Sequence, residues 1–153
     1  MFHHTLSRTR LYFGLLVTVG IVSAFIRILP WRLDYNDLAK QAYASYDMIE
    51  HGAWLVQESP DKMMATKPPF VAWLSAAIFL VCRNWLVAWH LPSFIAAVVV
   101  LLLFWKWENK QETAIFAGLI FLLNHFTQNM IFVIRTDMVL AMWVHIAVGM
   151  IYT

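Results

Sequence analysis

The chain has 153 residues, of which 61% are hydrophobic and 16% aromatic, while only 13% are charged. A soluble domain of this size cannot bury so much apolar surface in one core, whereas a lipid bilayer accepts it directly, so we expect an all-α, polytopic integral membrane protein. The formal net charge of +2, without a long basic stripe, argues against a nucleic-acid partner.

The first predicted span is the apolar stretch from Leu11 to Pro30, which is interrupted only by Arg27. About 20 residues cross a hydrocarbon core of about 30 Å, and an arginine side chain is long enough to reach the far interface. Because Arg8 and Arg10 precede this stretch, the positive-inside rule places the amino terminus in the cytoplasm. A signal anchor is one interpretation, and a cleaved signal peptide is the other, since small residues at 22–24 resemble a cleavage site.

Residues 31–69 contain the one long polar stretch, which is therefore expected outside the cytoplasm as the first extracytoplasmic loop. We predict a surface helix from Asp37 to His51, with Asn36 or Asp37 placed to cap its start and Gly52 placed to end it. Apolar side chains recur within it at the spacing of one helix face: Leu38, Ala42, Tyr46 and Ile49.

The remainder of the chain is mostly apolar. The segment Phe70 to Cys82 has about 13 residues, a length typical of a re-entrant or interfacial helix rather than of a full crossing. Three further crossings are predicted around a charged connector at residues 106–112: Trp85 to Trp105, Thr113 to Ile134, and Met138 to Thr153, of which the last only begins. Together with the first span they make about four transmembrane helices in one membrane domain, residues 1–153.

Sidedness depends on whether the segment Phe70 to Cys82 crosses the membrane. If it does not cross, the next two spans return Asp137 to the compartment of Asp37 and Lys67. If it does cross, Asp137 lies on the cytoplasmic face. The two lysines of the connector at residues 106–112 are balanced by two glutamates, so the positive-inside rule favours the first arrangement only weakly.

Four elements in order carry a family resemblance: Asp37 opening the surface helix, the run at residues 47–55 with its Gly52-Ala53-Trp54 step, Lys67-Pro68-Pro69 before Trp73, and Arg135-Thr136-Asp137-Met138 at the start of a later helix. Together they resemble the amino-terminal third of GT-C glycosyltransferases of the protein O-mannosyltransferase and aminoarabinose lipid A transferase type. The resemblance covers most of the chain. It implies a catalytic aspartate in the first extracytoplasmic loop, a polyprenyl-phosphate sugar as donor, no cofactor, and a place in a bacterial inner membrane.

Members of that family are much longer, so the resemblance implies a partial or truncated enzyme. Leu38 stands where the family commonly has a glutamate, and Gln41 stands where it has a tyrosine. These departures favour an alternative in which the chain is a non-catalytic remnant or an assembly partner of a glycosyltransferase.

The chemistry of such a transfer requires a base for the acceptor hydroxyl and a cation for the departing phosphate. Displacement with inversion uses one carboxylate opposite the leaving group, and Asp37 is our candidate for this catalytic base. The competing interpretation of Asp37 is a helix N-cap at the membrane interface. Ionised groups at a bilayer boundary cost free energy unless water, a partner or a substrate solvates them, which is why these charges are candidates at all.

Lys67 is the candidate phosphate ligand, because the two prolines that follow it restrict the backbone that presents the ammonium group. Alternatively, Lys67 reaches to lipid headgroups from the start of a helix. Asp137 is predicted to orient the acceptor and Arg135 to neutralise donor phosphate. Equally, Asp137 and Arg135 simply pair with each other at a helix end.

The six histidines show no spacing typical of metal ligands, so we expect no structural metal. The single cysteine, Cys82, cannot form an intrachain disulfide and is predicted to be a buried, inert thiol. Membrane lipids are the other expected partners.

Overall fold

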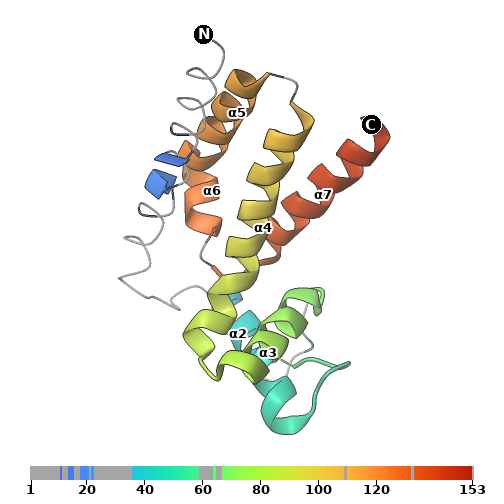
Figure 1. Ribbon diagram of the computed structural model, residues 1–153. Coiled ribbons are helices and arrows are strands. Elements are labelled where there is room, and N and C mark those ends of the chain that lie inside the picture. Colours follow the sequence, from blue (N-terminus) through green and yellow to red (C-terminus); the bar gives the residue numbers. More distant parts are fainter. Residues whose placement is uncertain are drawn as a thin grey trace.

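A computed structural model of the protein describes residues 36–58, 64, 67–108, 110–131 and 133–152, together with positions 11, 14, 15, 18–20 and 22. The described part is all-α, with one isolated antiparallel bridge between Glu58 and Met64. Its helices, shown in Figure 1, are α2 (Asn36–His51), α3 (Phe70–Cys82), α4 (Trp85–Trp107), α5 (Gln111–Leu123), α6 (His125–Met130) and α7 (Thr136–Tyr152). Within the predicted first span, the described positions are helical, and the rest of that span lies outside the described residues.

The longest described helix is α4, with 23 residues. Asn84 caps its start by accepting the backbone N–H of Val87 at 3.3 Å, and 23 residues rise about 34 Å along the axis. Among the described residues, α4 alone is both long and apolar enough to cross a membrane. The apolar helices α3, α5 and α7 are shorter, so four full-length crossings are not seen in this part of the chain.

The helix α3 begins and ends where the apolar segment predicted it, at Phe70 and Cys82. Arg83 follows with a left-handed backbone, φ 53°, and turns the chain from α3 into α4. The prediction that Cys82 is buried is wrong, because the thiol lies at the exposed end of α3, with its sulfur 3.5 Å from the carbonyl oxygen of Asn84. Apolar residues adjacent to Cys82 in the sequence therefore did not show which side of α3 it lies on.

The span predicted from Thr113 to Ile134 is not one continuous helix. The helix α5 ends at Leu123, and α6 starts again at His125. Between them, the Asn124 side chain accepts the backbone N–H groups of Phe126 at 2.9 Å and Thr127 at 3.4 Å. Asparagine competes in this way for the donors at the first turn of a helix and is therefore favoured at caps over helix interiors. The Asn124 side chain thus separates two helices within a segment whose apolar composition predicted one.

The helix α2 has nearly the predicted bounds, and Gly52 follows it with φ +71° as expected for a residue that ends a helix. Its buried face differs from the predicted one, because Tyr46 is exposed and Ile49 is only partly buried. The side chains that α2 buries are Leu38, Gln41, Ala42, Ala44, Ser45 and Met48. Small residues on this face let neighbouring helices approach closely, which a search for large apolar side chains misses.

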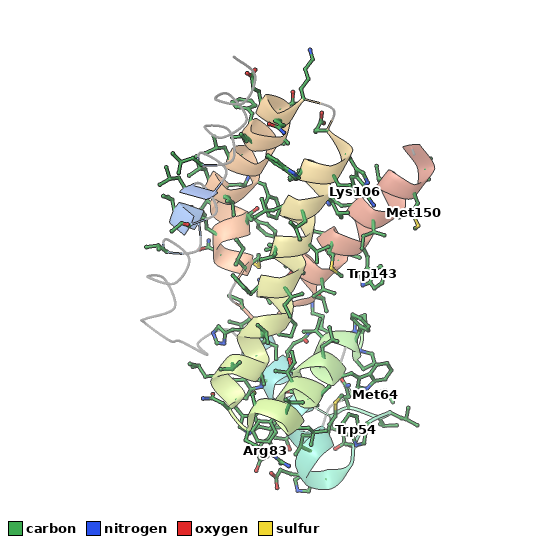
Figure 2. All side chains as sticks on the ribbon, viewed as in Figure 1. Trp54, Met64, Arg83, Lys106, Trp143 and Met150 are labelled. Atoms are coloured by element: carbon green, nitrogen blue, oxygen red, sulfur yellow. The ribbon has the colours of Figure 1, made fainter. Side chains whose placement is uncertain are left out.

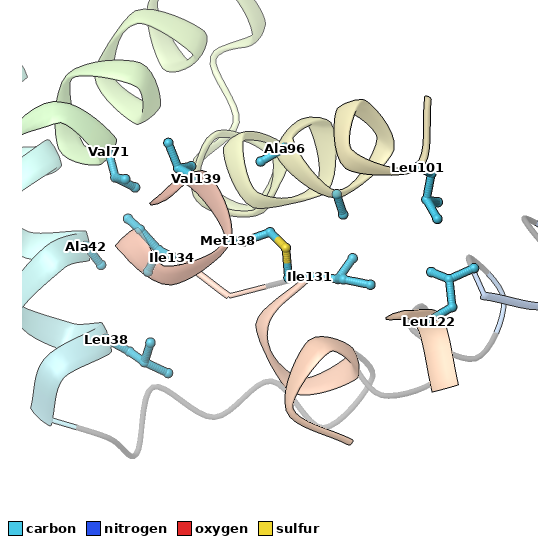
Figure 3. Packing of buried hydrophobic residues seen from close by; sticks show 11 residues of the cluster. Leu38, Ala42, Val71, Ala96, Leu101, Leu122, Ile131, Ile134, Met138 and Val139 are labelled. Carbon is cyan, nitrogen blue, oxygen red and sulfur yellow. The ribbon is translucent and has the colours of Figure 1, made fainter. Parts of the chain in front are cut away.

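Two apolar clusters hold the helices together. In the smaller cluster, Ala44 and Met48 of α2 pack against Ala72 and Ala76 of α3. The larger cluster joins residues of α2, α3, α4, α5 and α7 with Ile131 and Ile134, which lie between α6 and α7, and Figure 3 shows it. Along α4, the helices α2 and α3 lie beside the first half, and α5 and α7 extend along the second half (Figure 1). The helices α2 and α3 therefore lie at the end of the molecule where α4 begins.

Candidate functional site

The first turns of three helices meet in the larger apolar cluster. Leu38 comes from the first turn of α2, Val71 from the first turn of α3, and Met138 from the first turn of α7. Figure 3 shows Leu38 and Val71 on either side of Ile134, which lies just before α7. Helix starts that are far apart in the sequence are thus brought together by their own apolar residues.

This convergence is what positions the predicted site residues. Asp37 directly precedes Leu38, and Arg135 and Asp137 lie between Ile134 and Met138. Lys67 precedes Val71 by four positions. Asp37, Arg135 and Asp137 are thus sequence neighbours of cluster residues, and Lys67 stands in the segment that leads into α3. The side chain of Asp37 lies outside the described residues.

The segment that leads into α7 is held by α4. Ser93, which is fully buried in α4, donates its hydroxyl to the carbonyl oxygen of Val133 at 2.6 Å. The backbone N–H of Arg135 also donates to Val133, at 2.8 Å. A buried hydrogen bond of this kind sets the height at which α7 starts relative to α4, and with it the position of Arg135 and Asp137.

Arg135 and Asp137 form an ion pair, with the Arg135 Nε 3.0 Å from the Asp137 Oδ2. The two side chains are 35% and 39% exposed, so water reaches both of them. A pair at this exposure contributes about 0–1 kcal/mol to stability. The sequence raised the alternative that Arg135 and Asp137 pair with each other, and this ion pair is present. Both groups remain partly exposed, so a ligand can reach them.

Lys67 is exposed and stands two positions before Pro69, which is the N-cap of α3. The carbonyl oxygen of Pro69 accepts the backbone N–H of Trp73 at 2.9 Å and so begins the helix. The indole N–H of Trp73 in turn donates to the carbonyl oxygen of Trp54 at 2.8 Å. This bond ties the glycine-tryptophan step after α2 to the lysine-proline-proline start of α3.

Sequence reasoning missed the polar residues that support the site. Ser45, Ser93 and Trp89 lie in helices that we assessed by their apolar pattern, yet each makes a hydrogen bond between elements distant in sequence. A serine within an apolar helix is the one signal that points to such contacts, because a hydroxyl away from water needs a partner. Among the described residues, no group of three His, Cys, Asp or Glu side chains is arranged to hold a metal ion.

A comparison of the chain with protein-family models, with curated proteins and with solved structures finds no significant match. Functional interpretation therefore depends on the chain's own residues and their arrangement.

Proposed function

We propose that this chain forms the donor-side part of a membrane glycosyltransferase. It transfers a sugar from a polyprenyl-phosphate donor to an acceptor at the extracytoplasmic face. The observation that supports this proposal is the meeting of the first turns of α2, α3 and α7 in one apolar cluster. Asp37, Arg135 and Asp137 stand next to members of this cluster in the sequence, and Lys67 stands four positions before Val71. We infer that their charged groups act on one substrate, which such a transfer needs.

In the proposed reaction, the acceptor hydroxyl oxygen attacks the anomeric carbon of the sugar, and the bond from that carbon to the phosphate oxygen breaks. Asp37 takes the acceptor proton as general base. Lys67 holds the phosphate that leaves with the electron pair of the broken bond. Arg135 adds positive charge for the phosphate, and Asp137 orients both the acceptor and the Arg135 guanidinium, to which it is paired.

The membrane arrangement that accompanies this reaction has about four crossings and a cytoplasmic amino terminus, in a bacterial inner membrane. In this arrangement α4 crosses the bilayer, whereas the 13 residues of α3 do not. Residues 31–69, with α2, lie on the extracytoplasmic side. The starts of α3 and α7 then face the same compartment, as the shared cluster of Val71 and Met138 supports.

The direct test is sugar transfer by the full-length protein in proteoliposomes, with polyprenyl-phosphate mannose and polyprenyl-phosphate aminoarabinose supplied in parallel. Asp37→Asn is expected to lower transfer by about 10²–10⁴-fold, the usual contribution of a general base. Asp47→Asn is the matched control, because Asp47 lies on the same helix and pairs with His51 at 2.8 Å. Near-normal transfer by Asp37→Asn would remove the base assignment.

A second candidate is a non-catalytic partner of a glycosyltransferase, which binds the lipid phosphate without transferring the sugar. The ion pair between Arg135 and Asp137 favours it, because each group already has a structural partner. So does Leu38, which is used for core packing where the resembled family has a carboxylate. Binding of polyprenyl phosphate that depends on Lys67, without transfer of either sugar, would establish this second function in place of the first.

A further inference from the structure

The outward side of α3 is apolar along its whole length. Phe70 and Trp73 at its start and Leu80 and Val81 at its end are exposed, and Val81 has 87% of its surface accessible. The opposite side of α3 carries the buried residues Val71, Ala72, Ser75 and Ala76. A helix with a packed apolar side and an exposed apolar side is typical of contact with a second apolar phase.

The segment after α2 extends this exposed apolar surface. Leu55 is 86% exposed, and Val56 and Met64 are also exposed. The bond from the Trp73 indole to the Trp54 carbonyl attaches the segment to α3, and the bridge between Glu58 and Met64 closes it. Leu55 and Val56 therefore lie between two points of attachment, the Trp54 carbonyl and the bridge at Glu58.

The surface is also continuous with α7. The ring of Phe70 lies 6.5 Å from the ring of Trp143, centroid to centroid, and Trp143 is exposed. In Figure 2, Met150, Trp143, Met64 and Trp54 follow one edge of the molecule from the end of α7 to the segment after α2. We call the exposed apolar residues of α3 and of this segment the lower flank: Trp54, Leu55, Val56, Met64, Phe70, Trp73, Leu80 and Val81.

The depth of the lower flank follows from α4. A hydrocarbon core of about 30 Å requires almost the full length of a 23-residue helix. The helix α3 packs against α4 and lies beside its first half in Figure 1. Figure 2 places Arg83 and Trp54 at one end of the molecule and Lys106 toward the other. When α4 crosses the bilayer, α3 therefore lies at the depth of one leaflet, with Trp54 near the level where charged residues meet water.

We propose that the lower flank is immersed in lipid, within the extracytoplasmic leaflet, with Trp54 near the headgroups. This inference rests on the membrane placement of α4 in the proposed function. Lipid is the occupant that fits, because the flank continues the exposed apolar sides of α4 and α7. The tryptophans of the flank fit as well, since interfaces enrich this amphipathic side chain. The segment after α2 thereby anchors the candidate site against the membrane.

The test uses single cysteines labelled with the environment-sensitive fluorophore NBD, in the full-length protein with Cys82→Ser, reconstituted in phosphatidylethanolamine and phosphatidylglycerol nanodiscs. Leu55→Cys and Val81→Cys report on the lower flank, and neither side chain is packed in the core. Leu102→Cys on the exposed side of α4 is the membrane control. Glu50→Cys on the exposed side of α2 is the aqueous control.

Lipids with a spin label on the acyl chain are expected to quench the probes at positions 55 and 81 several-fold more than the probe at 50. Iodide in the buffer is expected to show the reverse order. If positions 55 and 81 respond to iodide as position 50 does, the lower flank faces water and the inference is overturned. Blue-shifted emission without lipid quenching also overturns it, because another polypeptide or a second copy then covers the flank. Failure of lipid to quench position 102 would instead contradict the placement of α4, and so separates the two proposals.

Discussion

Trp89 of α4 donates its indole N–H to the Oγ of Ser45 in α2, at 2.9 Å. The Ser45 hydroxyl in turn donates a hydrogen bond to the carbonyl oxygen of Ala42, at 2.7 Å. Ser45 is fully buried, so this chain of two bonds satisfies every polar group it contains. It fixes the loop helix α2 to the helix that crosses the membrane in our proposal, and thereby holds the first turn of α2 in place.

Removal of either partner is expected to destabilise the contact between α2 and α4. Trp89→Phe deletes the donor and Ser45→Ala deletes the acceptor, and a double-mutant cycle separates their coupling from the loss of packing. We expect a coupling energy of about 0.5–1.5 kcal/mol. The free energy of unfolding in mixed detergent micelles measures it. Strict additivity of the two substitutions would show that the bond contributes nothing.

Two buried serines are expected to behave in opposite ways. Ser93→Ala removes one of the two donors to the Val133 carbonyl oxygen, which keeps the backbone N–H of Arg135, so we expect a cost of about 0.5–1.5 kcal/mol. The Ser75 hydroxyl is buried in α3 and has no hydrogen-bond partner among the described residues, so we expect Ser75→Ala to be neutral or stabilising. The same unfolding assay compares them, and an equal loss of stability from both substitutions would contradict the two assignments.

The ion pair between Arg135 and Asp137 gives a prediction that separates a structural role from a functional one. Arg135→Gln and Asp137→Asn are each expected to change stability by less than about 1 kcal/mol, because both side chains are partly exposed. Each is expected to reduce sugar transfer. The exchange of the two charges, Arg135→Asp with Asp137→Arg, restores the pair but misplaces both groups. Recovery of transfer in this double variant would show that the pair serves only the fold.

Two glycines, on the helices α5 and α7 that both pack against α4, are expected to respond differently to an added methyl group. At Gly118 of α5, a Cβ would meet Leu101 at 3.4 Å, an ordinary contact. Gly118→Ala is therefore expected to stabilise the protein by about 0.5–1 kcal/mol through helix propensity. At Gly149 of α7, a Cβ would overlap the ring of Trp107, and Gly149→Ala is expected to cost about 1–3 kcal/mol. Thermal unfolding of the purified variants checks the sign of each change.

The sequence was sufficient for the features that local chemistry controls. The bounds of α3 follow from an apolar run that Pro68 and Pro69 precede and Arg83 ends, and Gly52 supplies the positive φ that ends α2. The length of α4 follows from its apolar run, despite Pro92. Signals of this kind act over a single helical turn, so they can be recognised without knowledge of the fold.

The sequence also contains the capping residue Asn124, but the apolar composition around it led us to predict a single span. A window of about 20 apolar residues suggests one span, whereas a single side chain that accepts two backbone N–H groups is enough to divide it. The buried face of α2 was misjudged for a related reason. Large residues such as Tyr46 dominated the pattern, while the packing is made by Ala42, Ala44 and Ser45.

By itself, the sequence determined the helical class, the apolar character and the charges that are candidates for chemistry. Only the tertiary structure decided that the starts of α2, α3 and α7 meet, because Leu38, Val71 and Met138 share one cluster. No pattern along the chain encodes which helix starts become neighbours. That choice follows from the simultaneous packing of small side chains and the satisfaction of buried hydroxyls such as Ser93, which depend on all the helices at once.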